Sequence, residues 1–138
     1  MAAETAPSHV FVYGTLLPGD VRWPLLQPFV VDAGWTDTVE GRLFDTGFDY
    51  PAALFDERAT PHGSIVGRTF PLLTTSLDRC LAVLDHEEGT VGGHYRRVVV
   101  TTERGVRAWA YEYGTDLDLV PIEGGDWIEH RATSRSDS

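Results

Sequence analysis

Short apolar runs separated by glycine and proline are the feature of this sequence that most restricts its fold. The runs are rich in β-branched and aromatic residues, which is typical of strands rather than helices. Two of them, joined at Glu103-Arg104-Gly105, have the pattern of a hairpin. The predicted strands are 9–13, 29–45 with breaks, 51–55, 64–70, 95–102 and 106–114.

Only the stretch 74–89, TTSLDRCLAVLDHEEG, has the periodicity of an amphipathic helix. Its apolar residues follow the spacing i, i+3, i+4 and i+7, and a capping-box pattern and a glycine mark its two ends. Many strands with one main helix predict an α+β domain with a small, mixed, barrel-like sheet and short flanking helical turns. The apolar residues of the helix are Leu77, Cys80, Leu81 and Leu84; the capping box is Thr75 with Asp78, and the glycine at the far end is Gly89.

No repeat or linker divides the 138 residues, so 9–130 is predicted to be a single domain, with 1–8 and 131–138 as flexible tails. A net charge of −10 makes nucleic acid and anionic membranes poor partners. The sequence contains no apolar stretch of about 18 residues, and because no basic region followed by an apolar run opens it, we expect no signal peptide. Its single cysteine fits a reducing compartment, and we expect a cytoplasmic protein.

Glu88 is the most informative residue of the predicted helix, because helical spacing places its carboxylate among apolar side chains. At about 100° per residue it lies about 20° from Leu77, between Leu81 and Leu84. Desolvation and the negative end of the helix dipole would both raise the pKa of this carboxyl, which suits a general acid/base. The alternative is that the helix frays near residue 86 and Glu88 turns to solvent.

The residues that flank Glu88 fall elsewhere on the same helical wheel. His86 lies on the opposite side and Glu87 about 80° from Leu77, so both are expected to face water or the flank of the helix. The geometry therefore singles out Glu88 among the three polar residues at this end of the helix.

The first predicted strand ends at Tyr13-Gly14-Thr15-Leu16, where a glycine permits a sharp change of direction. Consecutive N–H groups at such a corner can bind a carboxylate or a phosphate without a cation. An ordinary turn is the alternative interpretation of the same four residues.

Other chemistries have weaker support in the sequence. The five histidines lack the spacing of paired metal ligands, so we expect no metal site and no cofactor. Cys80 lies on the apolar side of the predicted helix and is expected in the core. Ser64 is not in a Gly-x-Ser-x-Gly elbow.

Several stretches, taken in order, resemble the γ-glutamylcyclotransferase-like family. They are VFVYGTL, YPAAL, VGRTF, LDHEEGTVGGHYRRVVV, AWAYEY and GDW, and they span residues 10–127. The most specific are Tyr-Gly-Thr-Leu and the Leu-Asp-x-x-Glu-Gly that ends at Gly89. The resemblance implies a small mixed β-barrel with flanking helices.

The resemblance also implies an enzyme that cyclises a γ-glutamyl group and releases 5-oxoproline and a free amine, without a cofactor. Glu88 would be the catalytic acid/base, and the backbone of the opening corner would hold the α-carboxylate of a small-molecule substrate. A non-catalytic module that binds an amino-acid-like anion is the alternative function. The implied substrate-binding residues are Tyr13, Gly14, Thr15, Leu16, Tyr95 and Tyr111.

The sequence departs from the family directly after the corner. Many bacterial members carry a basic or polar residue there, whereas this chain continues Leu17-Pro18-Gly19-Asp20. We therefore expect this stretch to influence which amine side of the substrate is accepted.

Overall fold

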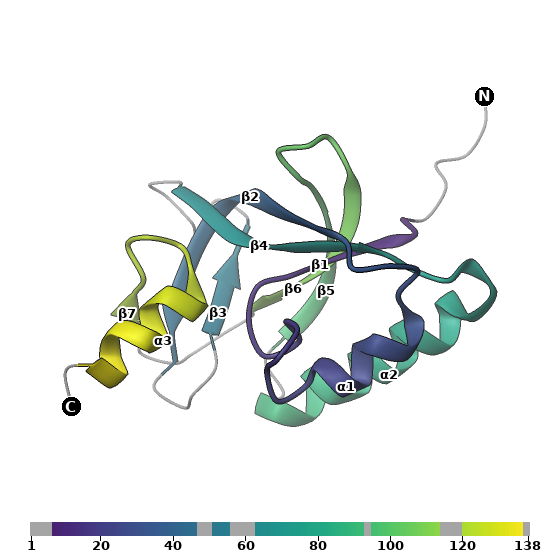
Figure 1. Ribbon diagram of the computed structural model, residues 1–138, viewed down its shortest axis with the longest axis horizontal. Helices are drawn as coiled ribbons and strands as arrows, with labels where there is room; N and C mark the ends of the chain where they lie inside the picture. Colours follow the sequence, from purple (N-terminus) through teal and green to yellow (C-terminus); the bar gives the residue numbers. More distant parts are fainter. Residues whose placement is uncertain (1–6, 47–50, 56–62, 93–94, 114–119, 137–138) are drawn as a thin grey trace.

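A computed structural model describes residues 7–46, 51–55, 63–92, 95–113 and 120–136. Its strands form one seven-stranded mixed sheet in the order β3-β2-β4-β1-β6-β5, with β7 paired to β2 (Figure 1). The strands are β1 (His9–Val12), β2 (Trp35–Asp45), β3 (Pro51–Leu54), β4 (Gly63–Pro71), β5 (Tyr95–Thr101), β6 (Arg107–Tyr113) and β7 (Val120–Pro121). Six of the seven correspond to predicted strands, and β7 was not predicted.

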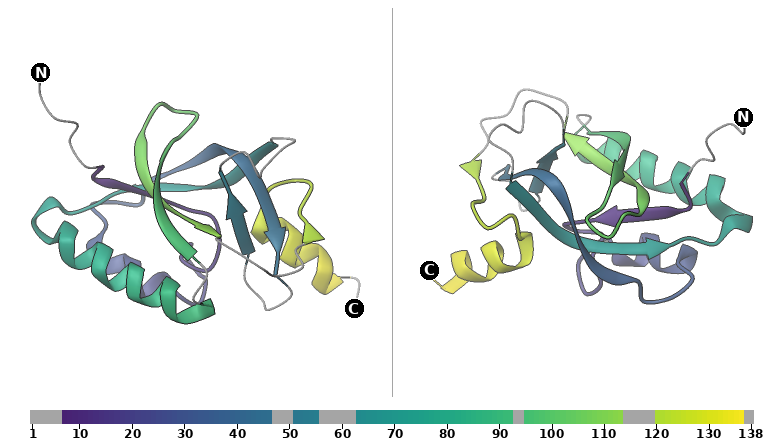
Figure 2. Two further views of the ribbon diagram at one scale, coloured as in Figure 1. Left: turned by 180° about the vertical axis from the view of Figure 1, so that it is seen from behind. Right: turned by 90° about the horizontal axis from the view of Figure 1, so that it is seen from above.

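The long strand β2 gives the sheet its curl, because its two halves pair with different partners. Its first half is antiparallel to β4, from Trp35 opposite Thr69 to Gly41 opposite Gly63. Its second half is antiparallel to β3 and β7. The sheet therefore bends along β2 into a half-barrel, which confirms the predicted barrel-like α+β fold (Figure 2).

A buried carboxylate fixes β2 against its neighbours. Asp37 is 4% exposed and accepts hydrogen bonds from Trp35 Nε1 and Thr69 Oγ1. Burial alone would raise its pKa, but these bonds, with those from Thr102 and the Thr38 N–H, hold the pKa below its ordinary value. Asp37 is thus a buried carboxylate whose charge is stabilised by hydrogen bonds.

The main helix, α2 (Leu77–Gly92), begins three residues later and ends three residues later than predicted. A 3-10 turn, Thr74–Ser76, precedes it. Among the described residues no hydrogen bond joins Thr75 to Asp78, so the predicted capping box is not formed. Gly89 lies inside the helix rather than at its end. The apolar face is confirmed, because Cys80 and Leu84 are fully buried and Leu81 is 8% exposed.

Helices cover opposite ends of the sheet. The short α1 (Trp23–Leu26), continued by a 3-10 turn over Gln27–Phe29, lies beside α2, while α3 (Trp127–Ser136) lies by β7 (Figure 1). No helix in the described part of the chain is both long and apolar enough to cross a membrane.

Helix α3 corrects the expected chain ends. Residues 131–138 were predicted to be a tail, but α3 continues to Ser136, and Arg131 is paired with a buried aspartate. At the other end, the Pro7 carbonyl accepts a hydrogen bond from Trp109 Nε1 at 2.8 Å. Both ends of the folded region are therefore held by contacts between residues distant in sequence. Residues 1–6, 137 and 138 lie outside the described part.

Candidate functional site: a pocket beyond the first strand

The backbone after β1 forms a tight loop whose carbonyl groups are used internally. Leu17 N donates to the Gly14 carbonyl at 3.0 Å, and Arg22 N donates to the Thr15 carbonyl at 2.8 Å. A trans peptide directs its C=O and N–H to opposite sides, so the N–H groups of Thr15 and Leu16 point away from these bonds. No described residue accepts a hydrogen bond from either N–H.

This loop forms one wall of a small, half-open pocket. All six residues proposed for substrate binding line it, although they come from the β1 loop, β5 and β6. The lining residues are Phe11, Val12, Tyr13, Gly14, Thr15, Leu16, Arg22, Pro51, Tyr95 and Tyr111.

The opposite wall comes so close to the loop that Gly14 has no room for a side chain. A Cβ on Gly14 would lie 2.6 Å from Pro51 Cγ and 2.8 Å from Pro51 Cδ. Pro51 is also the acceptor for Tyr95, whose hydroxyl donates to the Pro51 carbonyl at 2.6 Å. The width of the pocket at this point is thus set by β3 against the β1 loop.

The tyrosines of the pocket all give their hydroxyl protons to protein acceptors. In addition to Tyr95, Tyr13 donates to the Tyr111 carbonyl at 2.5 Å, and Tyr111 donates to Asp85 Oδ1 at 2.6 Å. The acceptors are carbonyl oxygens and a carboxylate, so the direction of each bond is fixed. Arg97 forms an ion pair with the same carboxylate oxygen, its Nε lying 3.0 Å from Asp85 Oδ1.

Arg22 joins the loop to α2. Its Nη1 donates to Thr15 Oγ1 at 2.9 Å, and its Nε donates to Glu87 Oε1 at 2.9 Å. Glu87 was expected to face water or the flank of the helix, and it does lie at the flank, half-buried in this ion pair. The exposed position expected for His86 is confirmed.

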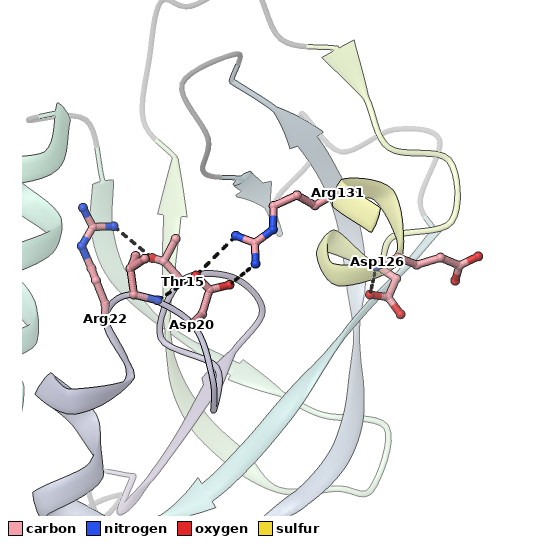
Figure 3. A network of polar contacts seen from close by, with 7 residues as sticks. Thr15, Asp20, Arg22, Asp126 and Arg131 are labelled. Atoms are coloured by element: carbon pink, nitrogen blue, oxygen red, sulfur yellow. Dashed lines mark hydrogen bonds and ion pairs between the residues drawn. The ribbon is translucent and has the colours of Figure 1, made fainter. Parts of the chain in front are cut away.

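A second ion pair holds the same loop from the side of α3. Arg131 Nη2 lies 3.0 Å from Asp20 Oδ2, and Arg131 Nη1 donates to Asp20 Oδ1 at 3.3 Å (Figure 3). The Asp20 side chain is only 2% exposed and also accepts the Val21 N–H. None of the residues 17–20 lines the pocket. Asp20, the last residue of the stretch that departs from the family, is therefore held against α3. The influence of this stretch on the amine side of the substrate remains a prediction.

Glu88 belongs to α2, and its side chain lies outside the part of the chain that the structure describes. Position 88 comes seven residues after Leu81 and four after Leu84, so its Cα lies on the same face of the helix as theirs. Two residues shortly before it, Asp85 and Glu87, reach the pocket residues Tyr111 and Arg22. The catalytic role of Glu88 remains a prediction.

The described residues contain no group of three or more His, Cys, Asp or Glu side chains that could hold a metal ion. The expected core position of Cys80 is confirmed, since the residue is fully buried. Burial raises the pKa of its thiol to about 11, which disfavours the thiolate needed for nucleophilic chemistry.

Sequence reasoning did not identify Arg22 and Pro51 as pocket residues, or Asp85 as the acceptor of the Tyr111 hydroxyl. Arg22 is the first lysine or arginine of the chain and follows the corner by six residues, which was a usable signal. Pro51 and Asp85 stand inside stretches that carry the family resemblance, YPAAL and LDHEEG, but nothing in their local pattern assigns them to a pocket.

Comparison with known proteins identifies a family match over most of the chain. Residues 10–129 match the family described as gamma-glutamyl cyclotransferase, AIG2-like. A provisionally named gamma-glutamylcyclotransferase of Halalkalibacterium halodurans is 30% identical over 100 residues, which are 71% of this chain and 87% of that protein.

Solved structures show the same fold at lower identity. A protein from Pyrococcus horikoshii has a TM-score of 0.66 and 23% identity, over 93% of this chain and 96% of its own. A uropathogenic Escherichia coli-specific protein has a TM-score of 0.70 and 18% identity, with coverage of 93% and 98%. These two likenesses concern the fold alone.

Proposed function

Because the chain belongs to the AIG2-like gamma-glutamyl cyclotransferase family, we propose that it cyclises the γ-glutamyl group of a small γ-glutamyl amine or peptide. The products are 5-oxoproline and a free amine. The observation that carries this proposal is the pair of N–H groups of Thr15 and Leu16, which have no acceptor among the described residues and belong to the wall of a pocket. Two adjacent N–H donors suit the two oxygens of a carboxylate.

The polar groups of the pocket suit both charges of an α-amino acid. The loop offers donors, which favour the α-carboxylate of the γ-glutamyl group. The hydroxyl oxygens of Tyr95 and Tyr111 have committed their protons elsewhere, so a ligand meets them as acceptors, which favour an ammonium group. Such a pocket would bind the glutamyl head in one orientation, which places its α-amine near its own γ-carbonyl.

The proposed reaction is intramolecular and needs one group that carries a proton. Glu88 removes a proton from the α-ammonium, and the freed amine attacks the γ-carbonyl carbon. The tetrahedral intermediate collapses as Glu88 gives that proton to the leaving nitrogen and the bond to this nitrogen breaks. A second proton passes from the ring nitrogen to the released amine, which departs as an ammonium ion. No water enters, and the protons and electrons balance without a metal or an organic cofactor.

The helix supports this role for Glu88. Position 88 lies on the α2 face that carries Leu81 and Leu84, both buried against the sheet. We expect a carboxyl group at this position to be partly desolvated, which would favour proton exchange near neutral pH. The buried, lone cysteine fits a reducing compartment, and we propose that the reaction takes place in the cytoplasm.

The test is a panel of γ-glutamyl compounds assayed for 5-oxoproline by mass spectrometry. The panel contains γ-glutamyl amino acids, ε-(γ-glutamyl)-lysine and γ-glutamyl anilides. We expect the wild type to turn over at least one of them and Glu88→Gln to reduce that rate at least 1,000-fold, because the only proton carrier is lost. Circular dichroism should show an unchanged fold.

Asp78→Asn is the matched control, since it removes an exposed carboxylate from the first turn of the same helix. We expect it to retain the wild-type rate. A Glu88→Gln rate equal to that of the wild type would show that another group carries the proton. Binding of these compounds without turnover by the wild type would instead indicate a binding module.

A further inference from the structure

We propose that Arg22 determines the specificity of the pocket by requiring a free carboxylate on the ligand. The proposal deepens the function proposed above, on which it rests for the identity of the ligand. In this view the β1 loop binds the carboxylate with backbone N–H groups and with one guanidinium, which the chain supplies from the start of α1.

The fold brings Arg22 back to the loop through its backbone. The Arg22 N–H donates to the Thr15 carbonyl at 2.8 Å, which closes a loop of eight residues, 15–22, beside the corner. Its side chain then lies along the loop and reaches Thr15 Oγ1 (Figure 3). Arg22 is thereby placed next to the residue whose own N–H points away from the turn.

The charge of Arg22 is singular in this pocket. Among the described residues that line the pocket, no other side chain carries a formal charge. The chain as a whole has a net charge of −10, so its mean field repels an anionic ligand. A local cation beside the donors offsets that repulsion where the carboxylate would bind.

The guanidinium retains donors for a ligand. An arginine has five N–H bonds, and here Nε is directed to Glu87 and one Nη1 proton to Thr15. No described residue accepts a hydrogen bond from Nη2. Thr15 Oγ1 accepts from Arg22, so its own hydroxyl proton is available to the same ligand. Arg22, Thr15 and the backbone thus offer donors from one side.

The alternative role for Arg22 is a structural tie between the loop and α2 through Glu87. The two roles predict different effects of removing Glu87. If Arg22 acts only as a tie, Glu87→Gln and Arg22→Gln should have the same effect. If Arg22 contacts the carboxylate, Glu87→Gln should preserve the preference for that group, because the guanidinium and its contact with Thr15 remain.

The test compares two probes that differ only in the carboxylate, 5-oxo-L-proline and 5-oxo-L-prolinamide, by calorimetric titration. We expect the wild type to bind 5-oxo-L-proline about 10- to 100-fold more tightly, as the loss of a charge-assisted hydrogen bond implies. Arg22→Gln should reduce this ratio to about threefold or less. Arg22→Lys should keep an intermediate ratio, since it retains the charge but not the planar fork.

Arg79→Gln is the matched control, because it removes the same charge from an exposed position on α2. We expect it and Glu87→Gln to keep most of the wild-type ratio. Overturning results are an unchanged ratio in Arg22→Gln, an equal loss in Glu87→Gln, or no preference in the wild type. If Arg22→Gln does not fold, Arg22→Lys compared with Glu87→Gln decides between the two roles.

The binding test of Arg22 and the turnover test of the proposed reaction can fail separately. A strong carboxylate preference that depends on Arg22, together with no release of 5-oxoproline from any γ-glutamyl compound, would refute the proposed reaction and support this inference. Release of 5-oxoproline by the wild type, together with an unchanged affinity ratio of the two probes in Arg22→Gln, would support the proposed reaction and refute this inference.

Discussion

At the scale of single residues, Gly14 shows how an absent side chain shapes the pocket. Its Cα faces the ring of Pro51 so closely that a methyl group would overlap Cγ and Cδ. Either the loop or the start of β3 must move to admit one. Both carry groups of the proposed site, namely the loop N–H donors and the carbonyl that accepts from Tyr95.

Gly14→Ala is therefore expected to lower the free energy of unfolding by about 1–3 kcal/mol, as overpacking of a tight contact does. It should also weaken binding of 5-oxo-L-proline at least tenfold. Chemical denaturation and calorimetry measure the two effects. Gly124→Ala, at a position with no atom within 4 Å of the added Cβ, should change stability by less than about 0.5 kcal/mol. Equal effects of the two substitutions would contradict this account.

At the scale of elements, α3 acts on the β1 loop from the far end of the chain. Trp127 anchors the helix in the core, being 2% exposed, and the Arg131 guanidinium lies 5.9 Å from the centre of its ring. From there Arg131 pairs with Asp20, 111 residues earlier. The loop is thus fixed by two arginine–carboxylate pairs, one to α2 and one to α3.

Removing Arg131 leaves the Asp20 carboxylate buried with little compensation, and this costs more than the pair itself contributes. We expect Arg131→Gln to lower the free energy of unfolding by about 3 kcal/mol in urea denaturation. The double variant Asp20→Asn with Arg131→Gln should recover part of that loss, because no charge is then stranded. A double variant less stable than Arg131→Gln would show that Asp20 does not depend on the pairing.

At the scale of the whole molecule, the pocket lies where two hydrophobic clusters meet. Phe11 and Tyr13 belong to the cluster inside the half-barrel, whereas Leu16 and Tyr111 belong to the cluster under α2. Successive residues of β1 point to opposite faces of the sheet, so a single strand contributes to both clusters. Docking of α2 closes the second cluster and buries Cys80 completely.

This docking predicts a pH dependence of global stability. Burial raises the Cys80 pKa to about 11 from an ordinary 9.0, so the folded state favours the neutral thiol. Stability is unaffected below pH 9 and falls as the pH rises towards 11, because only the unfolded thiol ionises there. The loss is about 2 kcal/mol. Urea denaturation of the wild type and Cys80→Ala at pH 8 and 10.5 measures it. An equal fall in both proteins would exclude Cys80 as the cause.

The predicted elements succeeded where the signal was local. Short β-branched and aromatic runs between glycines and prolines identified six strands. The spacing of Leu77, Cys80, Leu81 and Leu84 by three and four residues indicated the buried face of α2. The ends were less well predicted. Gly89 did not end the helix, because packing against the sheet outweighs the weak preference of one glycine. Helix α3 was missed because polar residues surround its one buried tryptophan.

The residues of the candidate site also differ in whether a local sequence signal could identify them. Tyr13, Thr15 and Leu16 could be named from a strand end and a glycine, and Tyr95 and Tyr111 from the family resemblance; all of them line the pocket. Arg22 and Pro51 could not be named in this way. Their places depend on loop closure and on the pairing of β3 with β2, and neither leaves a periodic trace in the chain.

By itself, the sequence determined the strands, the buried face of the main helix and the backbone corner, since these follow from hydrophobic periodicity and from the conformational range of glycine. Only the tertiary structure decided what surrounds that corner. Arg22 with Glu87, Gly14 with Pro51 and Asp20 with Arg131 are pairs separated by 65, 37 and 111 residues. Contacts of that range are fixed by how the sheet curls and where the helices dock, and not by any local preference of the chain.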